Sequence, residues 1–349
     1  MPNDDDYAIV VGIATYASYQ AIDAAEGDAR DFAKWLCDPQ GGDLPKKNVS
    51  LVLLLSSDLP PQLRIGRPIR DDVEDEFIKL LNNRVGRIGR RFYFYFSGHG
   101  CAPSYDEIAL IMANSSKGVP NRNIGARLYA ATLVERANFD ELVFFLDCCR
   151  GVDDTVDPQQ PPFKRPQPAV DYTNVKLTVA VGSQIGQLSN APDSPTQRSF
   201  FTEFLLEGLR GAAAAGDQSI SVESLMQYVK PKVTAKALNY GKRQVPELAK
   251  PAEIIFRKGI NNQRLITLGI KPGWPRPIEL QRGDGTLIRR SNVGDTKLQA
   301  VLAPGLYQIV FLGDSATGEP DVRQIIRINF GTTGAAAELD HQRTVEYNV

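Results

Sequence analysis

Two residues that could carry out nucleophilic chemistry each follow an apolar run. Cys149 comes soon after residues 142–146, and His99 follows the aromatic run of residues 91–97. A thiol beside an imidazole forms a nucleophile with its base, because the thiolate attacks a carbonyl carbon while the imidazole handles the proton. The chain has only two histidines, and the other, His341, lies in a region predicted to be β-rich, where we expect it at the surface. His99 is therefore the predicted base.

The apolar runs before these residues predict buried strands. In a parallel sheet, neighbouring strands end at the same edge, and α/β proteins bind ligands at that edge. We therefore expect His99 and Cys149 to face each other there. The backbone N–H groups of Gly100 and Cys149 could hold a developing oxyanion. The glycines on both sides of His99 let a substrate backbone come close.

The elements needed to position these residues alternate between strand and helix patterns up to about residue 258. Apolar or β-branched runs predict strands at residues 7–14, 48–55, 91–97, 142–146, 176–181 and 254–256, with a further edge strand or hairpin arm at 107–113. Helical stripes cover residues 24–36, a segment capped by Asp71 or Asp72, and residues 128–137, 200–209 and 222–238. This alternation predicts an α/β fold with three layers and a mostly parallel sheet.

The character of the sequence changes after this point. Short alternating runs at residues 265–270, 298–302, 307–312 and 324–330 are separated by Gly and Pro. Such spacing is typical of a small all-β sandwich. We therefore predict two domains, at residues 1–258 and 259–349.

Bulk composition excludes several classes of protein. With 40 Lys and Arg against 41 Asp and Glu, the chain has a net charge of −1 and lacks the basic field of a nucleic-acid binder. No window of about 18 uncharged apolar residues predicts a membrane span, and no signal peptide opens the chain. Four cysteines, two of them adjacent, do not form a disulfide framework. We expect a cytoplasmic protein.

The motifs around both residues resemble those of caspase-like cysteine peptidases (peptidase C14). The segment Asp147-Cys148-Cys149-Arg150-Gly151, with a histidine 50 residues upstream in Ser97-Gly98-His99-Gly100, is similar to metacaspases and bacterial orthocaspases. The resemblance covers about residues 5–256 and implies a caspase-like three-layer sandwich with a mostly parallel six-stranded sheet. It implies His99 as general base and Cys149 as nucleophile.

The resemblance also implies a substrate preference. The residue two positions before the nucleophile lines the primary specificity pocket, and here it is Asp147, while Asp28 resembles a second acidic residue of that pocket. Two carboxylates imply cleavage after Arg or Lys rather than after Asp. Residues 183–198 correspond to the region that presents its backbone to an extended substrate. The expected function is a regulated signalling or defence endopeptidase, with a partner protein bound by the C-terminal β domain.

Other interpretations stay open. The chain could be a catalytically inactive caspase-like scaffold, although a scaffold would need neither His99 nor Cys149. A flavodoxin-like ligand-binding domain would use the same sheet edge, but no phosphate-binding glycine motif supports it. Asp147 could instead cap a turn, and Asp28 could be a solvated carboxylate. We expect the side chain of Cys148 to point away from Cys149 and to pack in the core.

The proline-rich loop at residues 152–171 lacks periodicity, so we expect it outside the core, either mobile or functional. It could be an activation segment cut by the enzyme itself, with Lys164 the better site because Pro166 follows Arg165. Its acidic residues, Asp153, Asp154 and Asp157, could bind calcium, but they lack the EF-hand pattern and are more simply read as a solvated loop. We predict no metal or other cofactor.

Overall fold

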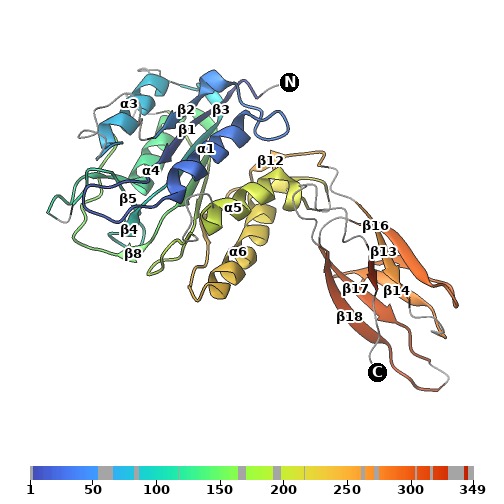
Figure 1. Cartoon of the computed structure of the whole chain (residues 1–349). Helices are drawn as coiled ribbons and strands as arrows, with labels where there is room; N and C mark the ends of the chain where they lie inside the picture. The colour runs from blue at the N-terminus through green and yellow to red at the C-terminus, as the bar shows by residue number, and fades with distance from the viewer. Residues whose placement is uncertain are drawn as a thin grey trace. The chain divides into compact units, whose positions relative to one another are not determined.

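The computed structural model describes residues 3–53, 66–81, 86–116, 118–163, 170–191, 198–215, 217–260, 264–270, 275–302, 305–314, 317–328 and 342–344. The chain forms two compact units (Figure 1). One comprises residues 1–209 and 221–256, and the other comprises residues 210–220 and 257–349. Among the helices of the described segments, none is long and apolar enough to cross a membrane.

The first unit is built around a six-stranded sheet with the strand order β11-β9-β7-β3-β1-β2. Five strands run parallel: β1 (Asp6–Gly12), β2 (Val49–Val52), β3 (Gly89–Ser97), β7 (Phe139–Asp147) and β9 (Lys176–Val181). At the edge, β11 (Glu247–Lys250) runs antiparallel to β9. The predicted mostly parallel sheet is therefore confirmed.

The identity of the sixth strand differs from the expectation. We predicted residues 254–256, but β12 (Ile255–Arg257) pairs with β10 (Ile220–Ser221) in a separate two-stranded sheet. The edge position belongs to β11, whose sequence Glu-Leu-Ala-Lys is half-buried or exposed throughout. An edge strand needs little apolar surface, so its pattern was too weak to identify.

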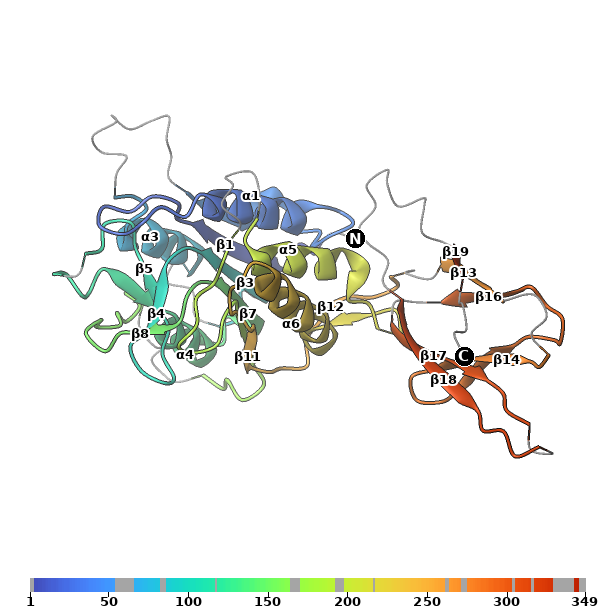
Figure 2. The ribbon, with the colours of Figure 1, turned by 60° about the horizontal axis from the view of Figure 1, so that its bottom comes forward.

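Helices cover both faces of the sheet (Figure 2). On one face lie α1 (Ala24–Cys37) and α5 (Phe200–Glu207), with α6 (Val222–Asn239) packed on α5 and a π-helical segment, Gly208–Ala212, after α5. On the other lie α3 (Arg70–Leu81) and α4 (Ala126–Arg136). A 3-10 turn, Lys46–Asn48, precedes β2.

Side chains of a strand alternate between these two faces. On β3, Tyr95 stacks on Phe32 of α1 with ring centroids 4.4 Å apart. Its neighbour Phe94 points the other way, toward Phe77 of α3, at 5.6 Å. Residues of β7 alternate in the same manner, because β3 and β7 pair in register. This alternation decides which face each site residue occupies.

A second, four-stranded sheet extends the carboxyl ends of β3 and β7. Its order is β6-β5-β4-β8, and β4, β5 and β8 lie together in Figure 1. The strands are β4 (Gly100–Ala102), β5 (Ala109–Ile111), β6 (Asn123–Gly125) and β8 (Gly151–Val152). The predicted edge element at residues 107–113 contains β5. This small sheet begins where the predicted catalytic residues lie.

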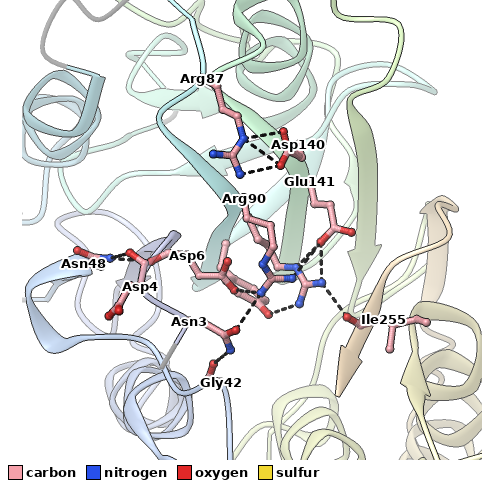
Figure 3. Close-up of polar contacts among 12 residues, drawn as sticks. Asn3, Asp4, Asp6, Gly42, Asn48, Arg87, Arg90, Asp140, Glu141 and Ile255 are labelled. Atoms are coloured by element: carbon pink, nitrogen blue, oxygen red, sulfur yellow. Dashed lines mark hydrogen bonds and ion pairs between the residues drawn. The ribbon is translucent and has the colours of Figure 1, made fainter. Parts of the chain in front are cut away.

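The opposite, amino-terminal edge of the large sheet is filled by ion pairs (Figure 3). Arg90 Nη2 lies 2.5 Å from the buried carboxylate of Asp6, and Arg91 Nη2 lies 2.6 Å from Glu141. Arg91, which is 1% exposed, also donates to the carbonyl of Ile255 at 2.7 Å. Buried charges of this kind are tolerated because they are paired and hydrogen-bonded. These ion pairs connect β1, β3 and β7 at this edge of the sheet.

Part of the proline-rich loop is anchored in the core, which corrects the expectation that it lies outside. Val156 is buried in the cluster beneath α3 and α4. The ring of Phe163 packs on Phe77 and Tyr129, with centroid distances of 5.5 and 5.7 Å. Aromatic and β-branched residues in a loop supply apolar area as they do in a helix, and the absence of periodicity concealed this. Lys164 lies outside the described residues.

The C-terminal unit contains two sheets, with orders β16-β13-β19 and β15-β14-β17-β18. Their inward side chains share one core, which includes Leu268, Leu280, Leu298 and Ile309. The strands are β13 (Arg264–Gly269), β14 (Ile278–Arg282), β15 (Leu287–Arg290), β16 (Lys297–Leu302), β17 (Gly305–Phe311), β18 (Val322–Ile328) and β19 (Gln342–Thr344). The predicted β architecture is present, and β14, β15 and β19 were not predicted.

Candidate active site

Two parallel strand pairs, β3 with β7 and β4 with β8, lie before and after the site along the chain, and in both pairs the opposed residues are 50 positions apart. In the large sheet, the ladder between β3 and β7 ends with Ser97 opposite Asp147. In the small sheet, the parallel ladder between β4 and β8 begins with Cys101 opposite Gly151. Both ladders have the same offset of 50 residues. The predicted base and nucleophile lie midway between them, also 50 residues apart, so the topology brings them to one point of the sheet edge.

The imidazole of His99 is oriented by a carbonyl group. Its Nε2 atom lies 2.7 Å from the carbonyl oxygen of Gln20. Because a carbonyl oxygen only accepts, we assign the proton to Nε2, which leaves a lone pair on Nδ1. The ring of Tyr16 meets the imidazole edge-on at 4.6 Å, and its hydroxyl accepts a 2.8 Å hydrogen bond from the His99 backbone. Burial lowers the pKa of His99 below its ordinary value, so the imidazole is neutral at pH 7.

The thiol of Cys149 is half-buried and lies beside Ser189. The backbone N–H of Ser189 donates to Sγ at 3.3 Å, and the thiol donates to the Ser189 carbonyl oxygen at 3.7 Å. Burial raises the pKa of this thiol, and the hydrogen bond from Ser189 opposes that rise. Within the described part of the chain no hydrogen bond joins the thiol to His99. Burial therefore favours the uncharged form of both the thiol and the imidazole.

Cys148 occupies the other face of the sheet, as predicted from strand alternation. It is fully buried in the core cluster beneath α3 and α4. A Cβ atom placed on Gly100 would lie 2.8 Å from the Cys148 sulfur, so glycine at position 100 makes room for this side chain. Burial raises the pKa of Cys148 well above its ordinary value. Its position indicates a packing residue.

The two predicted pocket carboxylates come together on the α1 face. Asp147 shares the strand face of Phe145, and Asp28 projects from α1 toward the same place. Both are almost sealed from solvent, at 3% and 0% exposure. The backbone N–H of Ser199 donates to Asp28 at 3.2 Å, and the Ser97 hydroxyl donates to it at 3.3 Å. Ser199 contacts both carboxyl groups, so Asp28 lies beside Asp147.

Hydroxyl groups surround Asp147. Its Oδ2 atom accepts from the Ser199 hydroxyl and from both the backbone N–H and the hydroxyl of Thr202, at 3.1 and 2.7 Å. Its Oδ1 atom accepts one bond, of 2.6 Å, from the Ser189 hydroxyl. Burial raises the pKa of Asp147, and the hydroxyl donors oppose the rise. For Asp28, burial and repulsion from Asp147 raise the pKa well above normal. The raised pKa values favour the neutral form of these buried carboxyl groups, and a cation placed beside them would favour their ionisation.

The segment after β9 joins the thiol to the carboxylate. Gly182 leaves room beside Asp147, because a Cβ there would lie 3.0 Å from Oδ1. Further along, Ser189 contacts both Cys149 and Asp147. Gln244, 1% exposed, donates to the Ser189 hydroxyl at 3.0 Å and to the Gly182 carbonyl at 2.8 Å. The side chain of Gln244 therefore holds this segment in place.

Several of these groups were not predicted from the sequence. Ser199 and Thr202 have the spacing of residues on one helical turn at the start of α5, which was a weak signal for a shared polar site. Ser189 falls inside the region predicted only as a substrate-binding segment. Gln20 gave no signal, because it acts through its backbone carbonyl.

The other predicted site features stay predictions. Gly100 is the first residue of β4, and Cys149 lies between the end of β7 and the start of β8. Asp153 is engaged in its own turn, where it accepts from the Thr155 backbone and hydroxyl at 3.2 and 2.6 Å. Among the described residues no group of three or more His, Cys, Asp or Glu is placed to hold a metal ion.

Comparison with known proteins gives three findings. The family model described as "Caspase domain" (peptidase C14) matches residues 5–252. A probable protease from a Desulfuromonadales bacterium is 27% identical over 285 residues, which are 75% of this chain and 34% of that protein. The chain therefore spans about a third of the length of this relative. The crystal structure of caspase-1 from Spodoptera frugiperda matches 74% of this chain and 91% of its own, with 16% identity and a TM-score of 0.47.

Proposed function

Because the chain belongs to the caspase-domain (peptidase C14) family, we propose that it is a cysteine endopeptidase that cleaves peptide bonds after Arg or Lys. The observation that supports the chemistry is the register of the two ladders on either side of His99 and Cys149, in which each residue of one strand pairs with the residue 50 positions later. The observation that supports the specificity is the buried carboxylate pair of Asp28 and Asp147.

The proposed reaction proceeds through a thioester. Nδ1 of His99 takes the proton of Cys149 as Sγ attacks the peptide carbonyl carbon, and the C–S bond forms. The N–H groups of Gly100 and Cys149 stabilise the oxyanion. His99 then gives its proton to the leaving amine as the C–N bond breaks. Water attacks the thioester carbon while His99 accepts one of its protons. The C–S bond then breaks, His99 returns that proton to the sulfur, and the new carboxylic acid loses its remaining proton to solvent.

The proposed specificity follows from charge. A guanidinium or ammonium group beside Asp147 would neutralise the carboxylate pair, whereas an Asp side chain would add a third negative charge. Among the described residues, the Ser189 hydroxyl is the one donor to Oδ1 of Asp147. By rotating away, this hydroxyl can leave Oδ1 to the cation without disturbing the three donors on Oδ2.

A panel of fluorogenic peptides ending in Arg, Lys or Asp tests the proposal. We expect the wild-type protein to cleave after Arg and Lys, and Cys149→Ala and His99→Ala to lose about 10³-fold or more in rate. The panel should be repeated with calcium and after incubation that permits cutting at Lys164. Cleavage after Asp would overturn the pocket assignment. If no peptide is cut under any condition, a non-catalytic scaffold becomes the better description.

We also propose that the protease is regulated and acts in the cytoplasm, in signalling or defence, and that the C-terminal β unit binds a partner protein. All described site residues belong to the first unit. The second unit has its own core and is thus available for another task. Affinity capture with the full chain as bait, compared with the same bait carrying Ile325→Asp, would test this, since Ile325 is 75% exposed.

A further inference from the structure

A hollow of about 260 Å³ lies close to His99. Two of its lining residues contact this histidine. The ring centroids of Tyr19 and His99 lie 5.5 Å apart, and the backbone N–H of Ile111 donates to the His99 carbonyl oxygen at 3.0 Å. The other walls come mainly from the loop between β5 and β6 and from the segment after β8, which includes Asp153. The proposed function does not use this hollow.

The hollow and the proposed P1 pocket lie on opposite faces of the sheet. Ile111 and Val156, which line the hollow, are buried in the cluster beneath α3 and α4, and Tyr19 packs against that cluster. Asp147 lies on the α1 face. In the proposed mechanism His99 gives its proton to the leaving amine, so the substrate residues after the scissile bond lie beside His99. The hollow therefore borders the residues that follow the scissile bond.

Asp153 supplies a carboxylate to this hollow. Its backbone N–H donates to the Ala102 carbonyl oxygen at 3.1 Å, which holds the residue beside β4. Its Oδ1 atom accepts from the backbone and the hydroxyl of Thr155 at 3.2 and 2.6 Å, so the turn fixes the carboxylate. Within the described segments no hydrogen bond or ion pair reaches Oδ2. Because Asp153 is only half-buried, this oxygen can accept from a ligand.

Tyr19 supplies an aromatic wall to the same hollow. Burial raises the pKa of its phenol, and the charge of Asp153 raises that pKa further, as expected of neighbouring side chains. A ring beside a carboxylate suits an ammonium or guanidinium group, because the ring attracts the cation and the carboxylate pairs with it. Among the described lining residues, Asp153 is the one carboxylate. A calcium ion needs several oxygen ligands, so an organic cation fits better.

Arg122 is the one cation among the described residues that line the hollow. It is exposed, and its Nη1 atom donates to the Asn114 carbonyl oxygen at 2.7 Å. No described carboxylate forms an ion pair with it, so its charge opposes the binding of a second cation, although salt screens this repulsion at the surface. Removal of the Arg122 charge should therefore act in the opposite direction from removal of the Asp153 charge.

We propose that this hollow binds a basic side chain of the substrate, one to three residues after the scissile bond, through Tyr19 and Asp153. The inference rests on the proposed function and extends it: the preferred substrate carries Lys or Arg shortly after the cleaved bond as well as at P1. Partly exposed ion pairs and cation–π contacts contribute modestly, so Lys should be favoured over Ala by about three- to tenfold in kcat/KM.

The first experiment uses internally quenched peptides that extend on both sides of a P1 Arg and carry Lys, Ala or Glu at P1′, P2′ or P3′. Mass spectrometry identifies the bond that is cut. At one of these positions we expect the rates to fall in the order Lys, Ala, Glu. Equal rates at all three positions would overturn the inference.

Three variants test whether the carboxylate of Asp153 causes this order. Asp153→Asn should lose the preference for Lys, although its amide oxygen can still accept from Thr155. Arg122→Gln should strengthen the preference. The matched control Asp154→Asn removes an exposed neighbouring charge that does not line the hollow, and it should keep the wild-type order. An equal loss of preference in Asp154→Asn would mean that the hollow is not the cause.

A second measurement separates this inference from the proposed function. Binding of the same peptides to Cys149→Ala, followed by fluorescence anisotropy, needs no turnover. A preference for Lys over Glu that is lost in Cys149→Ala/Asp153→Asn supports the hollow even if the wild-type protein proves latent. If the wild-type protein cuts after Arg but neither measurement shows a preference for a basic residue after the bond, the protease proposal stands and the hollow fails.

Discussion

At the scale of single residues, the adjacent thiols show how strand alternation separates two roles. Cys148 packs behind Gly100 on one face, while Cys149 meets Ser189 at the edge. We expect Cys148→Ala to keep kcat/KM within about threefold, since it touches no proposed reacting group. It should lose about 1 kcal/mol of unfolding free energy, because a buried sulfur is removed. Cys149→Ala should show the reverse, with little change in stability and no activity. An inactive Cys148→Ala protein of normal stability would mean that Cys148, and not Cys149, is the nucleophile.

The carboxylate pair makes a second prediction, about stability. The folded-state pKa of Asp28 is raised above its unfolded value by burial and by Asp147. Its contribution to stability is therefore fully present below about pH 4 and is lost as the pH rises through the raised value. Asp28→Asn removes this cost while an amide can still accept from Ser199 and donate to Ser97. At pH 7 we expect a gain of about 1 kcal/mol, or roughly 2–4 °C in Tm.

Thermal unfolding of the wild-type protein and of Asp28→Asn between pH 4 and pH 8 measures the expected gain in stability directly. The difference in Tm should shrink toward pH 4, where both proteins carry a neutral group at position 28. The stabilised variant should also cleave Arg peptides less well, since half of the proposed cation site is gone. A lower Tm for Asp28→Asn at pH 7 would show that the carboxylate is stabilising, and the proposed repulsion from Asp147 would then be wrong.

The residues of the proposed site differ in how well they could be predicted from the sequence. His99 and Cys149 could be found because each follows an apolar strand and carries a reactive side chain. Asp147 was assigned to the specificity pocket through the resemblance to metacaspases. Gln20 could not be found, because its carbonyl group is common to every residue and it lies 79 positions from His99. Contacts of backbone atoms over such separations depend on the loop path, which composition does not encode.

At the scale of elements, the small sheet is what keeps the chain in register beyond the ends of β3 and β7. Strands of two or three residues leave little periodicity, so β4 and β8 could not be predicted, whereas the long apolar β3 and β7 could. The space between β4 and the end of β7 is small. A Cβ atom on Gly100 would lie 2.8 Å from the Cys148 sulfur and 2.9 Å from the Cys149 carbonyl oxygen.

We therefore expect Gly100→Ala to cost about 1–3 kcal/mol of stability through overpacking, and to reduce kcat by shifting the strand that carries the proposed oxyanion donor. Adding Cys148→Gly removes the side-chain part of the clash but not the contact with the Cys149 carbonyl. The double variant should regain part of the stability lost by Gly100→Ala, beyond what the two single changes predict. Denaturant unfolding of the wild-type protein, the two single variants and the double variant gives the coupling free energy between positions 100 and 148. Strict additivity would mean that the two side chains do not compete for the same space.

At the scale of the whole molecule, the change from strand–helix alternation to short alternating strands could be read from the sequence, but the path of residues 210–220 could not. These residues group with the C-terminal part, where the backbone N–H of Ile260 donates to the Gln218 carbonyl at 2.9 Å. They follow a helix of the first unit, so their sequence neighbours suggest the wrong grouping. Contacts between distant parts of the chain decide which compact unit contains residues 210–220.

The separation of the two cores leads to a last prediction. All described residues of the proposed site, and the cluster beneath α3 and α4, belong to the first unit, while the other core is built from β13, β14, β16 and β17. A protein truncated after Lys258 should therefore keep the kcat/KM of the full chain for short peptides within about threefold. Calorimetry should show one unfolding transition for it and two for the full chain, because each core melts as a unit. The truncation leaves residues 210–220 without Ile260, so some loss of Tm is expected. If the truncated protein folds but no longer cleaves peptides, the C-terminal unit contributes to catalysis itself rather than to the choice of partner.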